Sequence, residues 1–319
     1  MLLLNIIIFI FSCTLLLLMG KWVVDSLIGL AHFLQLREFV MAFFVMAFAS
    51  CIPNFFVDIS SALRGIPQLA FGDVVGGNVV DFTIAVGLAA LISRGGITTN
   101  SRVVQSSMVF TFIIAILPLL LIWDGILGRA DGVILISVFF IYIYWLFSKK
   151  ERFSKVYQEK KTKKRSGVFL KDLIKLSIGV IVLLFAAQGI IKSSIAFSDI
   201  FNISLPLVGI LIVGLGNALP EIYFSLIAAK KGQDWLILGD ITGAVIIPAT
   251  LVLGIVALIS PIEMSGFSFS SFAVARFFMI ASAIFFFFFV KTDKKITQKE
   301  GLFLLFLYIA FLICEIFFK

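Results

Sequence analysis

The sequence predicts an all-α membrane protein with ten transmembrane helices in two inverted five-helix repeats. Three observations lead to this prediction: an apolar composition, an internal repeat, and the positions of the lysines and arginines. Of the 319 residues, 61% are hydrophobic and 14% are charged, and the mean hydropathy is +1.16. A soluble domain carries about 25% charged residues, so this composition indicates a chain that crosses a membrane several times.

An internal repeat joins residues 49–93 to residues 216–260, which align without a gap. The alignment places Pro53 on Pro220, a shift of 220 − 53 = 167 positions. The same shift pairs Gly65 with Gly232, Gly72 with Gly239, Asp73 with Asp240, Gly76 with Gly243, and Gly87 with Gly254. Chance matching of apolar residues does not place glycines, a proline and an aspartate in one register, so the alignment indicates an internal duplication.

The apolar runs are long enough to predict individual spans, since a helix needs about 20 apolar residues to cross a bilayer. Ten runs qualify: 2–31, 38–63, 69–93, 104–123, 132–148, 171–195, 204–230, 235–259, 270–290 and 300–318. The first lacks a basic start and a small-residue cleavage site, so it is interpreted as a span and not as a signal peptide. The predicted regions are a first repeat at 1–148, a basic loop at 149–170, and a second repeat at 171–319.

Basic residues concentrate in positions 149–165, which hold nine lysines and arginines against Glu151 and Glu159. Such an excess marks cytoplasmic loops, so we expect the 149–170 loop in the cytoplasm and both termini outside. This loop accounts for most of the net charge of +8, so the charge is interpreted as a sign of membrane topology and not of nucleic-acid binding. We expect the lipid bilayer, and no nucleic acid, as a partner of the chain. If the basic loop is cytoplasmic and each predicted span crosses the membrane once, residues 49–93 and residues 216–260 cross it in opposite directions. Inverted repeats are typical of secondary transporters, whose substrate site lies near the midplane between the repeats.

Polar residues inside these apolar runs mark the candidate site. Asn54 and Asp58 lie four residues apart on one face of the second predicted span, and Asp81 lies in the third. In the second copy, Glu221 takes the place of Asn54. Ionisable residues at membrane depth are costly and usually face an interior cavity. Oxygen ligands without nitrogen or sulfur suit hard cations such as Ca²⁺ or Na⁺, so we expect inorganic cations as the partners of this site.

Asp73 and Asp240 occupy the same position in the two copies, and they have two interpretations. Ionisable residues within apolar runs usually face an interior cavity, which makes both residues candidates for the site. An acid near the start of a helix is also favourable because of the helix dipole. The sequence leaves both interpretations open.

The repeated prolines suggest further ligands. Proline removes a helical hydrogen bond and frees the carbonyl about four residues earlier. For Pro53 and Pro220 these carbonyls lie near Ala49 and Gly216. Main-chain carbonyls that line a cavity in a broken helix can bind cations.

Several other kinds of chemistry are disfavoured. His32 is the single histidine, and the three cysteines lie far apart in apolar surroundings at Cys13, Cys51 and Cys314. We therefore expect no histidine-based metal site and no disulfide framework. The motifs Gly-x-Ser-x-Gly and His-Glu-x-x-His are absent from the sequence, so an intramembrane hydrolase that uses paired acids is a weak alternative. We expect no enzyme activity and no cofactor.

At these residues the chain resembles the cation/calcium exchanger superfamily, in particular its compact prokaryotic sodium/calcium exchangers. The repeats of that family carry Gly-Thr-Ser-Leu-Pro-Glu and, further on, Gly-Asn-x-x-Gly-Ser-Asn-x-x-Asn. The second copy here has Gly-Asn-Ala-Leu-Pro-Glu at 216–221. The first copy has Ala-Ser-Cys-Ile-Pro-Asn at 49–54 and Gly-Asp-Val-Val-Gly-Gly-Asn-Val-Val-Asp at 72–81. The resemblance covers most of the chain through the ten-helix layout.

The resemblance implies antiport of Ca²⁺ or a related cation against Na⁺ or H⁺ across a prokaryotic cell membrane. The central glutamates of the family fall on Asn54 and Glu221, and Asp81 falls where the family often has asparagine. One carboxylate is thus displaced from the second span to the third. The serines of the family's sodium sites become Gly77 and Ala244, so the counter-ion is open between Na⁺ and H⁺.

The predicted cation ligands are Ser50, Asn54, Asp58, Asp81, Asn217, Glu221 and Asp240. The leading hypothesis is a secondary-active cation antiporter that works by alternating access. The alternative is a sensor or partner-binding membrane protein that keeps the exchanger scaffold without transport. The replaced family ligands favour the alternative, and the retained membrane acids favour the antiporter. The sequence gives no prediction of the oligomeric state.

Overall fold

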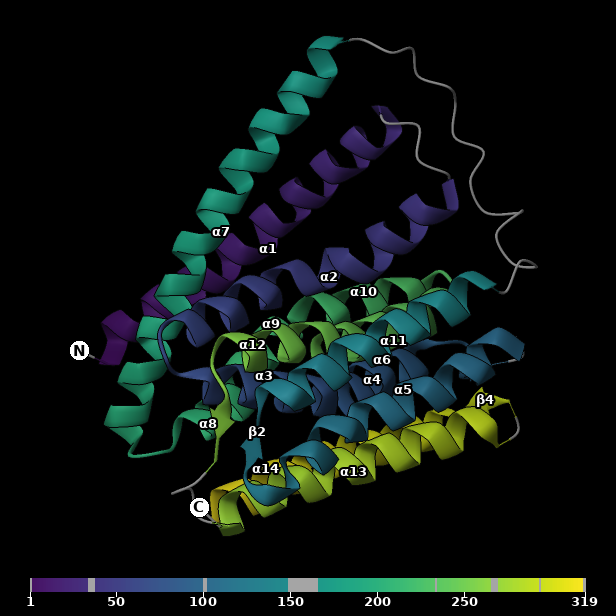
Figure 1. Ribbon diagram of the computed structural model, residues 1–319. Helices are drawn as coiled ribbons and strands as arrows, with labels where there is room; N and C mark the ends of the chain where they lie inside the picture. Colours follow the sequence, from purple (N-terminus) through teal and green to yellow (C-terminus); the bar gives the residue numbers. More distant parts are fainter. Residues whose placement is uncertain are drawn as a thin grey trace.

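The computed structural model describes residues 2–33, 38–99, 102–148, 166–232, 234–264, 269–292 and 294–317. Helices dominate these residues (Figure 1). The uninterrupted long helices are α1 (Leu2–Phe33), α2 (Glu38–Leu63), α5 (Arg102–Leu121), α6 (Arg129–Ser148), α7 (Ser166–Phe201), α13 (Phe269–Lys291) and α14 (Gln298–Phe317). A short 3₁₀ turn, η2 (Ile122–Asp124), extends α5.

Three further helical runs are interrupted by π-helical turns. The first is α3 (Pro67–Val80), η1 (Asp81–Ala85) and α4 (Val86–Ile92). The second is α8 (Leu205–Val208), η4 (Gly209–Val213), α9 (Gly214–Asn217) and α10 (Leu219–Lys230). The third is α11 (Asp234–Ile247), η5 (Pro248–Val252) and α12 (Leu253–Ile259). Single π turns inside α-helices are uncommon and occur frequently at functional sites.

The first and third interrupted runs correspond residue for residue. Adding 167 to the bounds of the α3–η1–α4 run, 67–92, gives 234–259, the bounds of the α11–η5–α12 run. Both π turns contain a threonine whose hydroxyl donates to the carbonyl four residues earlier, Thr83 to Val79 and Thr250 to Ile246. The register read from the sequence therefore recurs in the local helix geometry.

Two short antiparallel strand pairs were not predicted from the sequence. β1 (Ile97–Thr98) pairs with β4 (Lys295–Ile296), and β2 (Ile126–Leu127) pairs with β3 (Ile262–Glu263). Each pair joins a connection in the first half of the chain to one in the second half. The labels of β4 and β2 lie toward opposite sides of Figure 1. We use the β1–β4 pair and the β2–β3 pair to name the two ends of the bundle.

Some boundaries differ from the predicted ones. Helix α7 begins at Ser166, so the last residues of the predicted loop 149–170 are helical. The same helix continues to Phe201, beyond the predicted end of the span 171–195. The predicted span 204–230 corresponds to the helical run Leu205–Lys230, which is interrupted at η4 and again at Ala218.

Close backbone contacts position α3 against the second interrupted run. A Cβ atom added to Gly72 would lie 2.2 Å from the carbonyl oxygen of Pro206, and one added to Gly76 would lie 2.2 Å from that of Ile210. Small residues let membrane helices approach at this distance. The contact brings the polar residues of α3 next to those of α9.

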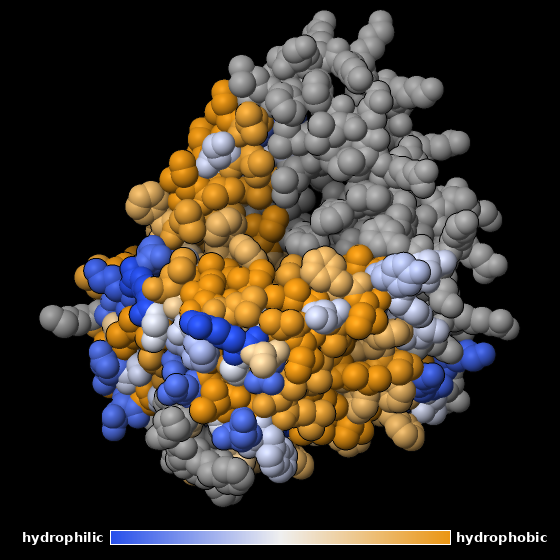
Figure 2. Space-filling view, in the orientation of Figure 1, coloured by the Kyte–Doolittle hydropathy of each residue, from blue (hydrophilic) through white to orange (hydrophobic). Residues whose placement is uncertain are grey.

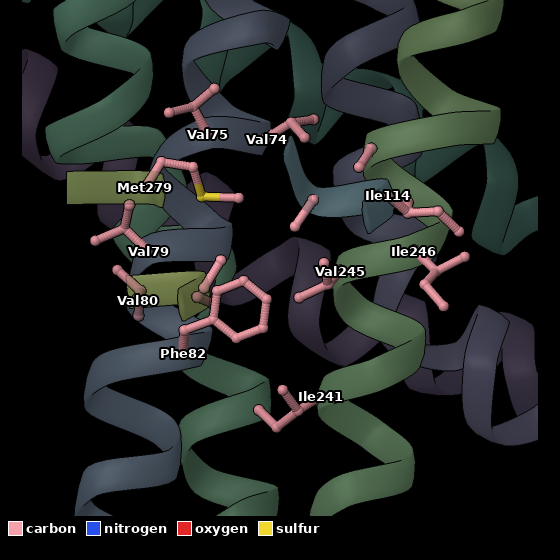
Figure 3. Packing of buried hydrophobic residues seen from close by; sticks show 14 of the residues in the cluster. Val74, Val75, Val79, Val80, Phe82, Ile114, Ile241, Val245, Ile246 and Met279 are labelled. Carbon is pink, nitrogen blue, oxygen red and sulfur yellow. The ribbon is translucent and has the colours of Figure 1, made fainter. Parts of the chain in front are cut away.

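The apolar core surrounds these interrupted helices. Figure 3 shows Val79 and Phe82 of the α3–η1 run near Val245 of α11 and Met279 of α13. The rings of Phe82 and Phe286 stack with centroids 4.9 Å apart. In Figure 1, α1 and α7 form a long pair that leans away from the rest of the bundle. A separate buried apolar cluster fills the contact of this pair with α2 and α8.

The described part of the chain contains eight helical runs that are long and apolar enough to cross a membrane. They are Leu2–Met19, Pro67–Ile92, Ser106–Asp124, Arg129–Leu146, Lys171–Phe201, Leu205–Lys230, Ile237–Ile259 and Ala273–Lys291. In Figure 2 a broad apolar surface lies between hydrophilic groups toward the left and right of the view. The protein is a helical, multi-pass membrane protein.

Candidate cation-binding site

The candidate site forms where the second interrupted run breaks. Helix α9 ends at Asn217, and Ala218 has φ −83° and ψ 0°, so the chain restarts as α10 at Leu219. Pro220 lacks an N–H group and therefore cannot donate to the carbonyl of Gly216. Glu221 lies in the first turn of α10, where the helix dipole favours a negative charge.

Three buried carboxyl groups lie within electrostatic range of one another near this break. Asp81 is the first residue of η1, Glu221 lies in α10, and Asp240 lies in α11. All three are at most 6% exposed. They are close enough to one another for electrostatic interaction. Each has one buried oxygen without a hydrogen-bond partner: Asp81 Oδ1, Glu221 Oε2 and Asp240 Oδ2. We call these residues the central acids.

A second polar group lies toward the β2–β3 end and consists of Asp58 of α2, Asp73 of α3 and Asn217 of α9. The Nδ2 amide of Asn217 donates to Asp73 Oδ2 at 2.8 Å. The Asp58 and Asp73 carboxyl groups lie within hydrogen-bonding reach of each other. All three residues are at most 4% exposed. We call Asp58 and Asp73 the acid pair.

The remaining predicted ligands are placed less completely. Asn54 is partly buried, and its Oδ1 has no hydrogen-bond partner. The side chain of Ser50 lies outside the part of α2 whose side chains the structure describes. Of the predicted set, the structure thus brings Asp81, Glu221 and Asp240 together and joins Asp58 and Asn217 to a residue outside the set.

That residue, Asp73, is the one that the prediction left out. The helix-start interpretation is wrong for Asp73, because the first turn of α3 contains no acid. It is also wrong for Asp240, because the acid in the first turn of α11 is Asp234. The shared repeat position of Asp73 and Asp240 was the signal that could have added Asp73 to the candidate residues.

No basic side chain neutralises these acids within the described residues. No described ion pair involves the five carboxylates Asp58, Asp73, Asp81, Glu221 and Asp240, and the interactions that act on them come from other acids and amides. Buried charges without partners are strongly unfavourable. Such acids are stabilised when they take up a proton or bind a cation from solution.

The acids do not form a closed metal cage by themselves. In the described ranges, no three histidine, cysteine, aspartate or glutamate side chains are grouped as they would be around one bound metal ion. A cation held by the central acids would need other oxygens, such as amides, hydroxyls, main-chain carbonyls and water. Near Glu221, Pro220 leaves the carbonyl of Gly216 without its helical N–H donor, so one main-chain oxygen is available at the break between α9 and α10.

Comparisons with known proteins agree with this picture. The sodium/calcium exchanger protein family matches residues 4–148 and 172–317. The putative antiporter CaxA of Alkalimonas amylolytica is 24% identical over 237 residues, 73% of this chain and 74% of CaxA. The sodium/calcium exchanger MaX1 of Methanosarcina acetivorans is 22% identical over 333 aligned positions, 92% of this chain and 93% of MaX1.

The fold is similar to that of a solved exchanger. The sodium-calcium exchanger NCX_Mj, soaked with 2.5 mM Na⁺ and 10 mM Sr²⁺, superposes with a TM-score of 0.64 at 23% sequence identity. The match covers 98% of this chain and 99% of that one. The chain is thus a multi-pass membrane protein with a buried, carboxylate-rich polar site. It belongs to the sodium/calcium exchanger protein family, which is a family of transporters and not of enzymes.

Proposed function

We propose that this protein is a secondary-active cation antiporter that exchanges Ca²⁺ or a related cation against Na⁺ or H⁺ by alternating access. The observation that supports this proposal best is the group of central acids, Asp81, Glu221 and Asp240. They come from three different elements, they are buried, and their unpartnered oxygens lie beside a broken helix. Competing cations would bind overlapping oxygens, so they would exchange and not travel together.

The proposed ligands have different roles. Asp81 and Glu221 neutralise a divalent cation, and Asp240 adds negative charge close to both. The amides of Asn54 and Asn217, the hydroxyl of Ser50 and main-chain carbonyls complete the oxygen shell in this proposal. Asp58 lies with Asp73 and contributes to the same polar interior from its β2–β3 end.

The transport mechanism rests on a proposed inverted repeat. The register of 167 residues that relates α3–η1–α4 to α11–η5–α12 supports a duplicated architecture. We propose ten spans, with the 149–170 loop in the cytoplasm and both termini outside, so that the two copies have opposite orientations. Two similar halves can then exchange conformations and open the site to one side of the membrane at a time.

A non-transporting protein on the same scaffold is the second candidate. It is favoured by Asn54, Gly77 and Ala244, which stand where the resemblance expects a glutamate and two serines. A protein without transport would not need the central acids, whose burial lowers stability when no cation is bound. Transport by the purified protein separates the two candidates.

The test is ⁴⁵Ca²⁺ uptake into sealed vesicles that contain the purified full chain. Uptake is measured under an imposed Na⁺ gradient and then under an H⁺ gradient. We expect uptake under at least one gradient, and the effective gradient identifies the counter-ion. Absence of uptake under both, from protein that unfolds cooperatively on heating, would exclude Ca²⁺ antiport and favour the non-transporting candidate.

A matched pair of variants locates the site. We expect Glu221→Gln to weaken Ca²⁺ transport about 100-fold, because removing one member of a buried charge interaction is strongly unfavourable. Glu315→Gln is the control, since Glu315 is another buried glutamate with unpartnered oxygens, and it lies in α14 outside the central acids. Equal transport by both variants would remove Glu221 from the proposed site.

A further inference from the structure

When all five buried carboxyl groups are ionised, they carry more negative charge than one divalent cation can cancel. They are the central acids and the acid pair, and no described basic side chain pairs with any of them. One divalent cation cancels two of the five charges. A buried charge that is not compensated is strongly unfavourable, so the interior requires additional positive charge besides one central divalent cation.

The acid pair has the geometry of an incomplete site. Both oxygens of Asp58 are buried and lack a hydrogen-bond partner, and so does Asp73 Oδ1. The two carboxyl groups nevertheless lie within hydrogen-bonding reach. Two ionised carboxylates cannot donate a hydrogen bond to each other, so either a proton or a bound cation must lie between them to make this contact favourable.

Four elements enclose the acid pair. Asp58 comes from α2, Asp73 comes from α3, and Asn217 at the end of α9 donates to Asp73 Oδ2. Cys13 of α1 interacts electrostatically with Asp73, and its Sγ would lie 3.5 Å from a Cβ added to Gly216. Because each wall comes from a different element, the pair lies in a built interior position and not on a helix surface.

We propose that the acid pair is a second cation site, which binds a divalent cation between the Asp58 and Asp73 carboxylates on the β2–β3 side of the central acids. The proposal rests on the proposed antiport function and extends it by a second ion. Two carboxylates match the charge of one divalent cation, and their four oxygens suit a hard ion such as Ca²⁺. Water completes the coordination shell.

The second site exists at one end only. The repeat position of Asp58 is 58 + 167 = 225, where the chain has Ser225. Ser225 is also buried, and its hydroxyl has no hydrogen-bond partner. Asp240, the repeat partner of Asp73, therefore lacks a second acid at the corresponding place. This asymmetry predicts that the added ion binds only on the β2–β3 side.

The experiment measures how many Ca²⁺ ions bind to each chain. The purified full chain is freed of divalent ions, and ⁴⁵Ca²⁺ binding is measured by equilibrium dialysis. We expect two ions per chain for the wild type and for the control Glu315→Gln. We expect one ion for Asp58→Asn, because the second site loses about 100-fold in affinity when one of its two acids becomes neutral. Asp58→Glu keeps the carboxylate and should retain both ions, which separates loss of binding from loss of folding.

The outcomes distinguish the two proposals. If the wild type binds one ion that Asp58→Asn retains and Glu221→Gln loses, the second site is overturned while the central site stands. In that case a proton bridges the acid pair. If the wild type binds no Ca²⁺, both the second site and Ca²⁺ antiport are overturned. If Glu221→Gln still binds one ion and the double variant Glu221→Gln/Asp58→Asn binds none, the second site is supported independently of the central one.

Discussion

At the scale of single residues, two glycines in the same repeat position have different surroundings. Gly72 faces the backbone of Pro206, with 2.2 Å between an added Cβ and the carbonyl oxygen. Gly239 is its repeat partner, since 72 + 167 = 239, and no described atom lies within 4 Å of an added Cβ there. The same substitution at both positions therefore tests the α3 contact without a change in chemistry.

We expect Gly72→Ala to destabilise the protein by about 1–3 kcal/mol, because the added methyl group must push two backbones apart. Gly239→Ala should be neutral or stabilising by up to about 1 kcal/mol, because alanine is the better helix former. Thermal unfolding in detergent measures both effects. Equal melting temperatures for the two variants would contradict the close contact between α3 and the second interrupted run.

Residue-level reasoning from the sequence identified most of the acids but not their grouping. Asp81, Glu221 and Asp240 could be predicted because ionisable residues are rare in apolar runs. The contact of Asn217 with Asp73 could not be predicted, because the two residues are 144 positions apart in the sequence. The contact also depends on how closely α3 and α9 approach each other. Glycines on both helices, such as Gly76 and Gly214, allow this close approach. Their role in packing can be recognised only once the helices are placed against each other.

At the scale of elements, the break between α9 and α10 is the feature on which the proposed site depends. Pro53 and Pro220 occupy the same repeat position, yet Pro53 lies inside the continuous helix α2 while Pro220 stands in the first turn of the separate helix α10. The sequence predicted both prolines to free a carbonyl. It could not predict that one helix continues and the other restarts, because that choice depends on tertiary packing.

Replacing Pro220 tests the role of this break. In Pro220→Ala the new N–H can donate to the Gly216 carbonyl and repair the helix. We expect Ca²⁺ affinity to fall roughly fivefold, because a freed carbonyl that becomes hydrogen-bonded is a poorer cation ligand and such a bond contributes about 1 kcal/mol. The measurement is the Ca²⁺ concentration dependence of vesicle uptake.

Pro118→Ala is the control for this prediction, because Pro118 also lies inside a long helix, α5, and is no part of the site. This variant should keep the wild-type Ca²⁺ dependence. A similar loss in both variants would mean that helix flexibility in general, and not the Gly216 carbonyl, controls affinity.

Other element-level features were beyond prediction for physical reasons. A π turn such as η1 adds a residue to one helical turn without a distinct sequence pattern, so the run 69–93 could only be predicted as a continuous span. The strand pairs contain two residues in each strand, which is too short for a periodic signal. They form because four helix connections meet at the two ends of the bundle, which is a consequence of the whole fold.

At the scale of the whole molecule, the proposed mechanism depends on the direction in which each copy crosses the membrane. The two copies contain equivalent helix-terminating turns, at Arg64-Gly65 and at Lys231-Gly232. Both glycines have positive φ, +74° and +65°, and both turns are exposed. If the repeats are inverted, equivalent turns must face opposite sides of the membrane, whereas direct repeats would place them on the same side.

We expect Arg64→Cys to react with a membrane-impermeant maleimide on intact cells and Lys231→Cys to react only after the membrane is made permeable. Each cysteine is introduced into a chain in which Cys13, Cys51 and Cys314 have been replaced, and transport by that chain is checked first. Lys155→Cys, in the basic loop, should behave like Lys231→Cys because both positions are proposed to be cytoplasmic. Labelling of Arg64→Cys and Lys231→Cys from the same side would contradict the inverted repeat. The exchange of conformations between the two halves would then lose its structural basis, even if the central acids still bound a cation.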